Sequence, residues 1–200
     1  KLPEEPLRLA IGMYGGNIDF YDIKGVADAL LKTIRIYDCD YVRTSDSDAF
    51  DEASAFHPGR SAVILKDGKA IGILGEIHPD VAENYGIEVK VYAAKLNVPE
   101  MLKLSEKDVT YKPMPKFPAT TRDLSLICDD NLPAASIEKA IKKAAGKVLE
   151  KVTLFDVYKG KQIEEGKKSI SYSISMRSHD GTLTDEQADS VMKKVLKALK

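Results

Sequence analysis

Four carboxylates lie close together in the first half of the sequence, and oxygen ligands of this kind could bind a divalent cation. They are Asp46, Asp48, Asp51 and Glu52. Calcium loops place oxygen ligands at alternating positions, a glycine at the sixth position and a glutamate at the twelfth. Counted from Asp46, the fifth position is Phe50, the sixth is Asp51 and the twelfth is His57. The spacing therefore favours a solvated acidic loop.

Three histidines are the remaining candidates for metal binding or acid–base catalysis. His57, His78 and His179 are far apart in the sequence and lack the close pair at helical spacing that zinc sites often show. His57 and His78 each precede a proline, and we expect both to stabilise strand ends by hydrogen bonding. The sequence also lacks a nucleophile string such as G-x-S-x-G. We therefore predict no catalytic residue and no metal ligand. A small metal-dependent or acid–base enzyme that uses His57, His78 and the acidic loop is the alternative.

The elements of the second half can be placed from periodicity and turn residues. A β-rich segment at Leu124–Cys128 is followed by apolar positions at helical spacing from Ala134 to Ala145. Two further segments, Val148–Tyr158 and Lys168–Arg177, are rich in β-branched and aromatic residues and predict a long-looped hairpin. Thr184 is a candidate N-cap for a closing amphipathic helix.

The order strand, helix, strand, strand, helix predicts a ferredoxin-like βαββα(β) domain that lacks its last strand. We expect the chain to stop inside the last helix. In the third strand Ile170, Tyr172, Ile174 and Met176 alternate with Ser171, Ser173, Ser175 and Arg177, so one face should be buried. Phe155 and Tyr158 cannot be assigned to a face by alternation, and the core is the favoured place for both.

The first half predicts a sheet with few helices. Asp67-Gly68 is a strong hairpin signal, and Asp19 is a candidate N-cap. The expected strands are Leu7–Tyr14, Cys39–Thr44, Ser61–Leu65, Ala70–Leu74 and Val89–Leu96, and the expected helical segments are Asp19–Ile34, Asp80–Tyr85 and Pro99–Leu104. The fold class is α+β, with a mixed, mainly antiparallel sheet over residues 1–104, a proline-containing linker over 105–115 and the ferredoxin-like domain over 116–200.

Composition limits the class of protein. At 200 residues with 44% hydrophobic and 30% charged residues, the chain can form one or two ordinary cores. The sequence contains no apolar run as long as a membrane span. Cys39 and Cys128 fall in strands of different halves, so two separate buried thiols are favoured over a disulfide. We expect a cytoplasmic protein.

Positive charge is concentrated in the second half. Residues 1–110 hold 13 Lys and Arg against 19 Asp and Glu, whereas residues 111–200 hold 17 against 12. A mildly basic domain suits a polyanionic partner. Lysines on solvated helix faces account for the excess equally well.

Several strings of the sequence resemble a known family. In the second half they are Pro115–Leu126 (PKFPATTRDLSL), Leu154–Lys159 (LFDVYK), Glu165–Ser169 (EGKKS) and Thr182–Glu186 (TLTDE). These strings resemble the anticodon-binding domain of the bacterial phenylalanyl-tRNA synthetase β subunit. In the first half, Asp19–Gly25 (DFYDIKG), His57–Ala62 (HPGRSA) and Ile71–Pro79 (IGILGEIHP) resemble the class II synthetase-like, non-catalytic region of the same subunit.

The resemblance implies a C-terminal fragment that binds tRNA for phenylalanine and docks on the α subunit of an α2β2 assembly. The fragment alone would need no cofactor and would catalyse nothing, whereas the parent complex uses ATP and magnesium as an aminoacyl-tRNA ligase. The sequence agrees, because the Phe-Arg-x-Glu signature of active class II enzymes is absent from it. No DNA or membrane partner is expected. The alternative is a stand-alone RNA-binding or protein-interaction module.

Six cations near the expected strand ends are the candidates for RNA contacts. Guanidinium and ammonium groups pair with phosphate, and a guanidinium also stacks on a base. The candidates are Lys112, Lys116, Arg122, Lys159, Lys161 and Arg177. A sheet face left free by the helices, with Ser125, Ile127, the serines of the third strand and Arg177, is the other expected surface. For each cation, an ordinary surface position is the alternative.

Overall fold

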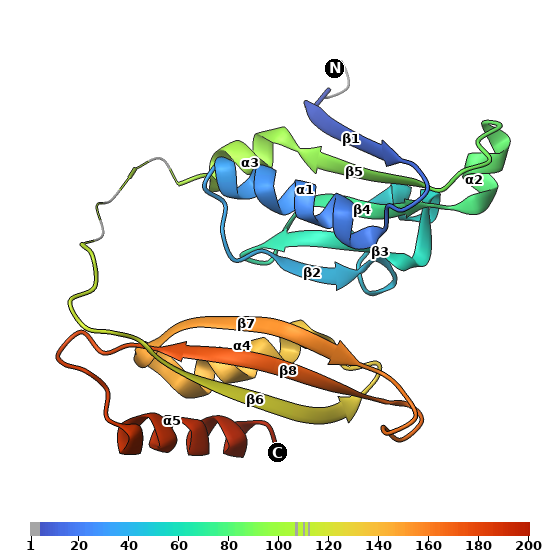
Figure 1. Cartoon of the computed structure of the whole chain (residues 1–200). Helices are drawn as coiled ribbons and strands as arrows, with labels where there is room; N and C mark the ends of the chain where they lie inside the picture. The colour runs from blue at the N-terminus through green and yellow to red at the C-terminus, as the bar shows by residue number, and fades with distance from the viewer. Residues whose placement is uncertain (1–4, 107, 110, 112) are drawn as a thin grey trace. The chain divides into compact units, whose positions relative to one another are not determined.

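The structure is a computed structural model that describes residues 5–200 except 107, 110 and 112. The chain divides into two compact units, residues 1–110 and residues 111–200. Each unit has its own sheet and its own hydrophobic core (Figure 1).

The first unit contains a five-stranded sheet in the order β1-β5-β4-β3-β2. Every strand pair described in it is antiparallel, so the parallel component of the expected mixed sheet is not found among the described residues. Its elements are β1 (Arg8–Tyr14), α1 (Phe20–Thr33), β2 (Asp40–Arg43), η1 (Thr44–Asp46), η2 (Asp51–Ala55), β3 (Phe56–Lys66), β4 (Lys69–Ile77), α2 (Pro79–Asn84), β5 (Val91–Asn97) and α3 (Val98–Leu104).

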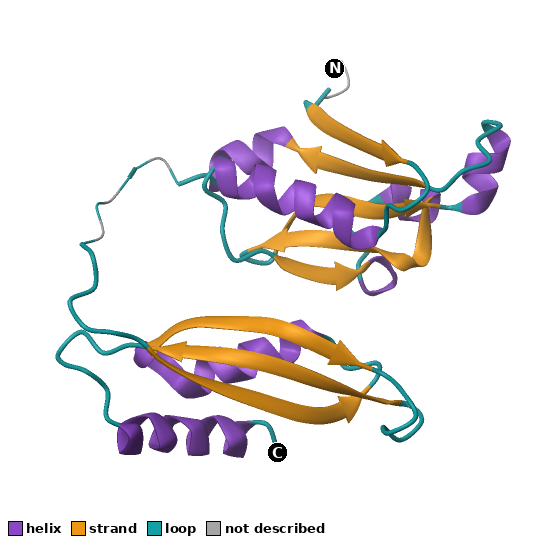
Figure 2. Cartoon of the chain, in the orientation of Figure 1, coloured by secondary structure: helices purple, strands orange, loops and turns teal. Residues whose placement is uncertain are grey.

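Helix α1 covers one face of this sheet (Figure 2). Its buried residues Ile23, Ala27 and Leu31 recur at helical spacing and pack against strand residues such as Leu74 and Leu96. The other face carries a smaller core of Phe56, Val63 and Ile73. Each fully buried aliphatic side chain of this kind contributes roughly 1.5–3 kcal/mol relative to exposure.

Local sequence explains where the elements of the first unit begin and turn. The Asp19 carboxylate accepts the backbone N–H of Tyr21 and Asp22, and the Asp22 carboxylate accepts the N–H of Asp19, which makes a capping box as expected from an Asp N-cap. Asp67 and Gly68 both have positive φ, at 50° and 76°, as a type I′ hairpin turn requires. The hairpin predicted around Asp67-Gly68 is therefore confirmed.

Strand β3 is longer than the sequence predicted. It begins at Phe56 rather than Ser61, because Pro58 and Gly59 lie in an irregular stretch of the strand instead of a turn. The register with β4 shifts between Phe56 and Ser61, which accommodates these residues.

The second unit contains a three-stranded antiparallel sheet in the order β6-β8-β7. This order is that of a ferredoxin-like fold, in which the first and third strands are neighbours. Its elements are β6 (Thr120–Asp129), α4 (Ala134–Ala145), η3 (Gly146–Val148), β7 (Leu149–Tyr158), β8 (Lys167–Met176) and α5 (Asp185–Ala198).

Helices α4 and α5 pack on one face of the three-stranded sheet (Figure 2). The alternation predicted for β8 is confirmed, because Ile170, Tyr172, Ile174 and Met176 are all at most 1% exposed. They contact Ile141 of α4, Val195 of α5 and the rest of the same core. Neither helix covers the opposite face of the sheet.

Helix α5 begins as predicted. Thr184 is its N-cap, and its hydroxyl accepts the Gln187 N–H while the Gln187 side chain accepts the Thr184 N–H. The helix ends at Ala198, and the N–H of the C-cap residue Leu199 donates to the Val195 carbonyl.

Candidate nucleic-acid interface

The solvent-facing side of the three-stranded sheet is built from alternate residues of β6 and β8. Asp123, Ser125 and Ile127 are exposed and lie opposite Ser173, Ser171 and Ser169. The Ser125 and Ser171 hydroxyls are 2.8 Å apart and hydrogen-bonded. The face predicted to carry Ser125, Ile127 and the β8 serines is confirmed.

This face carries little positive charge. Register places Asp123 and Asp129 of β6 and Asp156 of β7 on it, together with Lys151 and Lys167. Small hydroxyl side chains occupy its centre. Glu150 and Arg177 add one ion pair beside Ser175, so that four carboxylates stand against three cations and the face does not strongly attract phosphate.

Phe155 and Tyr158 are exposed rather than in the core. Phe155 is 56% exposed and Tyr158 is 43% exposed, so the favoured expectation for both is wrong. Leu154 pairs with Tyr172 and Asp156 pairs with Ser171, which leaves Phe155 as an extra residue in a bulge. A bulge turns the strand and breaks the alternation that would otherwise bury every second side chain.

Arg122 lies inside β6, not before the first strand as predicted. It pairs in register with Ile174, so its side chain starts on the helix-covered side of the sheet. The guanidinium Nη2 donates to Asp185 Oδ1 at 2.6 Å, and Nε donates to Asp189 Oδ1 at 3.4 Å. Hydrogen bonding to Asp185 is the main cause that raises the pKa of Arg122. Arg122 thus ties β6 to the first turns of α5.

Arg177 follows β8 and connects three segments of the second unit. Its Nε donates to Glu150 Oε1 at 2.9 Å and its Nη2 donates to Glu150 Oε2 at 3.1 Å, a fork geometry that favours a fixed guanidinium. Its Nη1 donates to the carbonyl of Phe117. Hydrogen bonding from Arg177 lowers the pKa of the Glu150 carboxyl.

Lys116 and Arg177 are brought together at a hollow in the second unit. We call this hollow the linker groove, and its volume is about 670 Å³. Its lining residues are Pro113, Met114, Pro115, Lys116, Phe117, Arg177, Ser178 and His179. Two of the six predicted cations therefore share one site, although they are far apart in the sequence.

The other predicted cations lie elsewhere. Lys159 and Lys161 are exposed in the loop after β7, where the Lys159 ammonium pairs with the Asp130 carboxylate. Hydrogen bonding to Lys159 lowers the pKa of Asp130. Lys112 lies outside the described residues. The five described candidates thus occupy three places: the β6–α5 contact, the linker groove and the β7–β8 loop.

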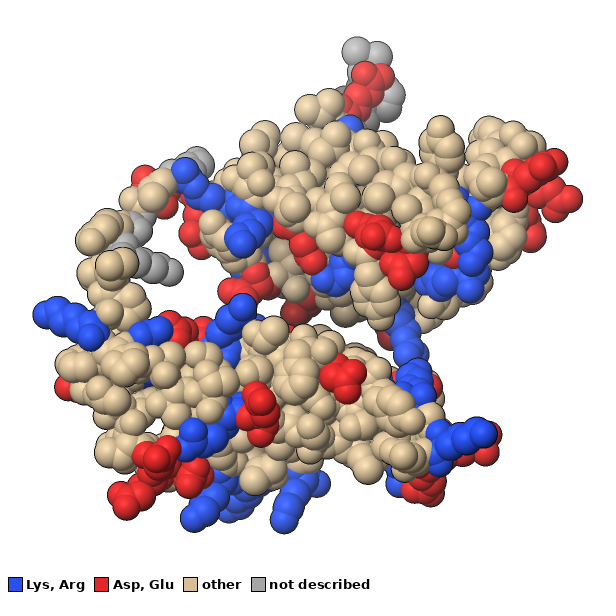
Figure 3. All heavy atoms as spheres, in the orientation of Figure 1, with Lys and Arg blue, Asp and Glu red and all other residues tan. Residues whose placement is uncertain are grey.

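Helix α5 is a further basic surface. Lys193, Lys194 and Lys197 are exposed on it, and Lys and Arg gather at this edge of the second unit in Figure 3. This is the pattern that a solvated helix face produces, and part of the charge excess of residues 111–200 lies here.

Sequence reasoning missed the apolar lining of the linker groove. Met114 is 86% exposed, between Pro113 and Pro115, and Phe117 is half-buried beside it. The available signal was a large apolar residue between two prolines in a polar segment. That signal does not show which residues, distant in the sequence, line the other side of the groove.

His57 and His78 lie side by side in the first unit, with ring centroids 6.5 Å apart. His57 Nδ1 accepts the Gly59 N–H at 3.0 Å, and His78 Nδ1 accepts the Asp80 N–H at 3.3 Å and caps α2. The predicted hydrogen-bonding role of both is confirmed. Among the described residues no group of three His, Cys, Asp or Glu side chains is arranged to hold a metal ion. Glu52 of the acidic loop pairs instead with Lys95.

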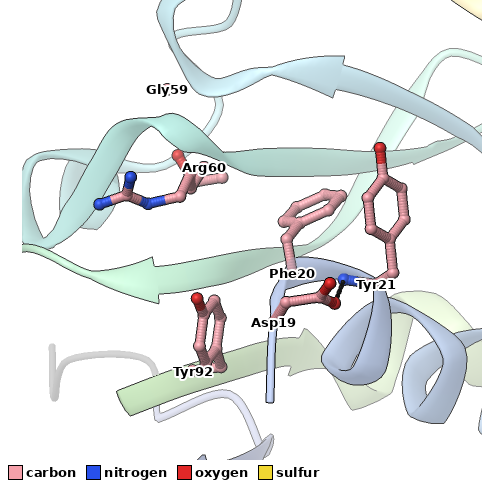
Figure 4. A pocket seen from close by; sticks show the side chains of 7 residues that line it. Asp19, Phe20, Tyr21, Gly59, Arg60 and Tyr92 are labelled. Carbon is pink, nitrogen blue, oxygen red and sulfur yellow. Dashed lines mark hydrogen bonds between the residues drawn. The ribbon is translucent and has the colours of Figure 1, made fainter. Parts of the chain in front are cut away.

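A second hollow, of about 380 Å³, lies in the first unit between the start of α1 and the neighbouring strands (Figure 4). Arg60 and Tyr92 line it, and both bind the buried Glu76. The Arg60 guanidinium reaches Glu76 at 2.6 and 3.0 Å, and the Tyr92 hydroxyl donates to it at 3.0 Å. The polar groups of Arg60, Tyr92 and Glu76 therefore have hydrogen-bond partners within the first unit.

Cys39 and Cys128 are both free and half-buried. Each packs against the core of its own unit, and burial raises the pKa of the Cys39 thiol. Among the described residues, every helix is too short or too polar to span a lipid bilayer.

Comparison with known proteins assigns both units. Residues 115–200 match the family model of the ferredoxin-fold anticodon binding domain, and residues 1–98 match that of the phenylalanyl tRNA synthetase beta chain CLM domain. The chain is 41% identical over its full length to the phenylalanine–tRNA ligase beta subunit of Clostridium acetobutylicum, of which it covers 24%.

Two other relatives carry the same name. The beta subunit of Clostridium tetani is 44% identical over 99% of the chain, which covers 24% of that protein. The beta subunit of Bacillus subtilis is 36% identical over 91% of the chain, which covers 22% of that protein. The chain thus spans about a quarter of the length of these relatives.

Proposed function

Because the chain belongs to the phenylalanyl-tRNA synthetase beta-chain family, we propose that it is the tRNA-binding and α-subunit-docking part of such a β subunit. It supports attachment of phenylalanine to its tRNA and catalyses nothing by itself. Activation of the amino acid, with ATP and magnesium, belongs to the α subunit of the parent α2β2 enzyme. The Phe-Arg-x-Glu signature needed for that chemistry is absent from this sequence.

One observation carries the RNA-binding part of the proposal. The unit that matches the anticodon-binding model holds an excess of positive charge and a groove where Lys116 and Arg177 meet apolar side chains. Cations supply affinity for phosphate, and apolar or aromatic side chains supply contact with unstacked bases. We propose residues 116–200 as this domain, residues 1–104 as the class II-like region and residues 105–115 as the linker.

The six cations contribute unequally in this proposal. Lys116, Lys161 and Lys112 make phosphate contacts, and Arg177 contacts RNA from its fixed position in the linker groove. Three of the cations already have carboxylate partners: Lys159 pairs with Asp130, Arg122 with Asp185 and Asp189, and Arg177 with Glu150. Each of these three must exchange a carboxylate for phosphate to make a full ion pair with RNA, which lowers its net gain on binding.

Docking on the α subunit is assigned to the first unit. It exposes several large apolar and aromatic side chains, including Leu7, Tyr14, Tyr85 and Leu102. Aromatic residues are enriched at protein interfaces. The proposed cellular location is the cytoplasm, with no DNA or membrane partner.

The test is a titration of the chain with tRNA for phenylalanine and with an unrelated tRNA at low and near-physiological salt. We expect saturable binding to the first tRNA that weakens with salt, because phosphate contacts release counterions. A preference for the first tRNA supports reading of the anticodon region by this chain alone. No binding to either tRNA at low salt contradicts the RNA-binding part of the proposal.

A further inference from the structure

We propose that residues 113–115 form a stiff strap that turns on Lys116 and closes over the linker groove. In the closed position Met114 packs against the wall that residues 177–179 form. The strap and this wall both line the same hollow of about 670 Å³. The movement takes place within the second unit and requires no RNA.

Prolines restrict the backbone on both sides of Lys116. Three of them fix their own φ angles at about −65°. They are Pro113, Pro115 and Pro118. Met114 and Phe117 each precede a proline, which confines both to extended conformations. Lys116 is neither a proline nor followed by one, so rotation about its backbone bonds moves the strap as one piece.

Lys116 and the strap are not tied to the rest of the second unit. Lys116 is exposed and lies in a bend, outside any helix or strand. Within the part of the chain that the structure describes, no hydrogen bond or ion pair involves Lys116, Pro113, Met114 or Pro115. Turning the strap therefore breaks no such contact between described residues.

The chain is anchored directly after the hinge. The Phe117 carbonyl accepts a hydrogen bond from Arg177 Nη1, and the Phe117 ring is half-buried. The guanidinium of Arg177 is itself held by Glu150, at 2.9 and 3.1 Å, and the Ser175 hydroxyl donates to the same carboxylate at 3.1 Å. Phe117 thus moves with the sheet, and the freely turning segment begins at Lys116.

Exposed apolar surface supplies the driving force for closure. Met114 is 86% exposed although it lines a hollow. Removing apolar surface from water is favourable, and an unbranched thioether side chain adapts to an irregular wall. Because Glu150 neutralises Arg177, Met114 closes against an ion pair and the His179 ring and not against a bare cation. The loss of Met114 rotamer freedom opposes closure, so we expect an equilibrium between open and closed positions.

The first experiment measures ¹⁵N relaxation at the Met114 and Phe117 amides of the whole chain. We expect an order parameter of about 0.85 for Phe117, as in rigid backbone, and either a value below about 0.6 or millisecond exchange for Met114. Lys116→Pro fixes φ at the hinge and should bring Met114 toward the value of Phe117. Lys116→Gly should make Met114 more mobile than in the unaltered chain.

Lys116→Ala is the matched control, because it removes the ammonium group and keeps an ordinary backbone. Met114 should move in this variant as it does in the unaltered chain. Unchanged amide signals of β8 show that each variant is folded. A Met114 amide as rigid as β8 in the unaltered chain, without exchange, overturns the hinge. Equal mobility of Met114 in the proline and glycine variants overturns it as well.

A second pair of variants tests the anchor. Arg177→Gln removes the donor to the Phe117 carbonyl and should give Phe117 the mobility of Met114. Arg122→Gln cuts a guanidinium contact elsewhere in the same unit, with Asp185 and Asp189, and should leave Phe117 rigid. An ordered Phe117 in Arg177→Gln would show that the anchor lies elsewhere and would overturn this part of the proposal.

The second experiment tests closure through the Met114 methyl group, labelled with ¹³C and assigned with a Met114→Leu variant. We expect a nuclear Overhauser effect between this methyl group and the ring protons of His179 in the unaltered chain. The effect should persist in Lys116→Ala, and His179→Ala should remove it. A mobile Met114 without any contact to residues 177–179 would leave the hinge standing and overturn the closure.

Discussion

At the scale of single residues, Glu76 shows how one buried charge is accommodated in the first unit. It is 3% exposed, and an isolated carboxylate at such a position would be strongly disfavoured. Burial by itself raises the pKa of Glu76, but the hydrogen bonds from Arg60 and Tyr92 outweigh burial and leave the pKa below its ordinary value. Burial, together with the hydrogen bond to Glu76, raises the pKa of Tyr92.

The lowered pKa of Glu76 fixes the direction of a pH effect. Because the folded chain holds this proton less tightly than the unfolded chain, the ionised carboxylate stabilises the fold above the ordinary pKa of 4.5. That contribution is lost as the pH falls below this value.

The substitution Glu76→Gln should lower the stability of the first unit by about 1–3 kcal/mol at neutral pH, because Arg60 and Tyr92 lose their charged acceptor. The difference between the two proteins should shrink as the pH falls below 4.5. Hydrogen exchange at the amides of β3 and β4 measures this difference in stability. Glu83→Gln, at an exposed position of α2, is the matched control. Equal protection of Glu76→Gln and the unaltered chain at neutral pH would contradict the assignment.

At the scale of elements, the contact between β3 and β4 depends on a glycine. Gly75 has φ of +152°, and a Cβ there would lie 2.4 Å from the Arg60 carbonyl oxygen and 2.5 Å from Ser61 Cα. Both neighbours are backbone, so neither can move aside without shifting the strand. The close approach lies where the β3–β4 register is irregular.

Gly75→Ala should therefore destabilise the first unit by about 1–3 kcal/mol or more, through overpacking and a disfavoured backbone conformation. Gly12→Ala is the control, since a Cβ at Gly12 in β1 would meet nothing within 4 Å. Hydrogen exchange of the β3 amides separates the two variants. A Gly75→Ala protein as stable as the Gly12→Ala protein would show that the strands separate at little cost.

Local signals were enough to predict many elements. Asp19 and Thr184 are N-caps with complete capping boxes, and the alternation of Ile170 to Met176 identified the buried face of β8. These features depend on residues a few positions apart, which is the range that propensity and periodicity describe. The chain's membership in its family also follows from short strings that can be read directly.

Features that depend on pairing between distant segments could not be predicted. Arg122 falls inside β6 because Thr120 pairs with Met176, so the strand starts earlier than its β-rich core suggests. Phe155 is exposed because the β7–β8 register contains an extra residue there. The linker groove requires Phe117 and Arg177 to meet across 60 positions of sequence. No local pattern contains that information.

At the scale of the whole molecule, a net charge of −1 combines an acidic first unit with a basic second unit. The net charge of the whole chain therefore says little about what the chain binds. A polyanion responds to the local field of the unit that it approaches, within about 10 Å at ordinary ionic strength.

Produced separately, residues 111–200 should retain salt-sensitive tRNA binding, and residues 1–110 should bind little. With two or three phosphate contacts, affinity should fall by about tenfold between 50 and 200 mM salt. Filter binding or fluorescence anisotropy at several salt concentrations gives the slope. Strong RNA binding by residues 1–110 would contradict this prediction and would show that the acidic unit carries an RNA interface.

Each unit carries one free cysteine, Cys39 in the first and Cys128 in the second. The chain is thus ready for two-colour fluorescent labelling without an added residue. Burial raises the pKa of Cys39, so little of its thiol is in the reactive thiolate form at neutral pH, and its alkylation should be slow. Labelling with a mixture of donor and acceptor maleimides can then place dyes on both thiols. Energy transfer between the dyes would report the distance between the two units, with and without RNA.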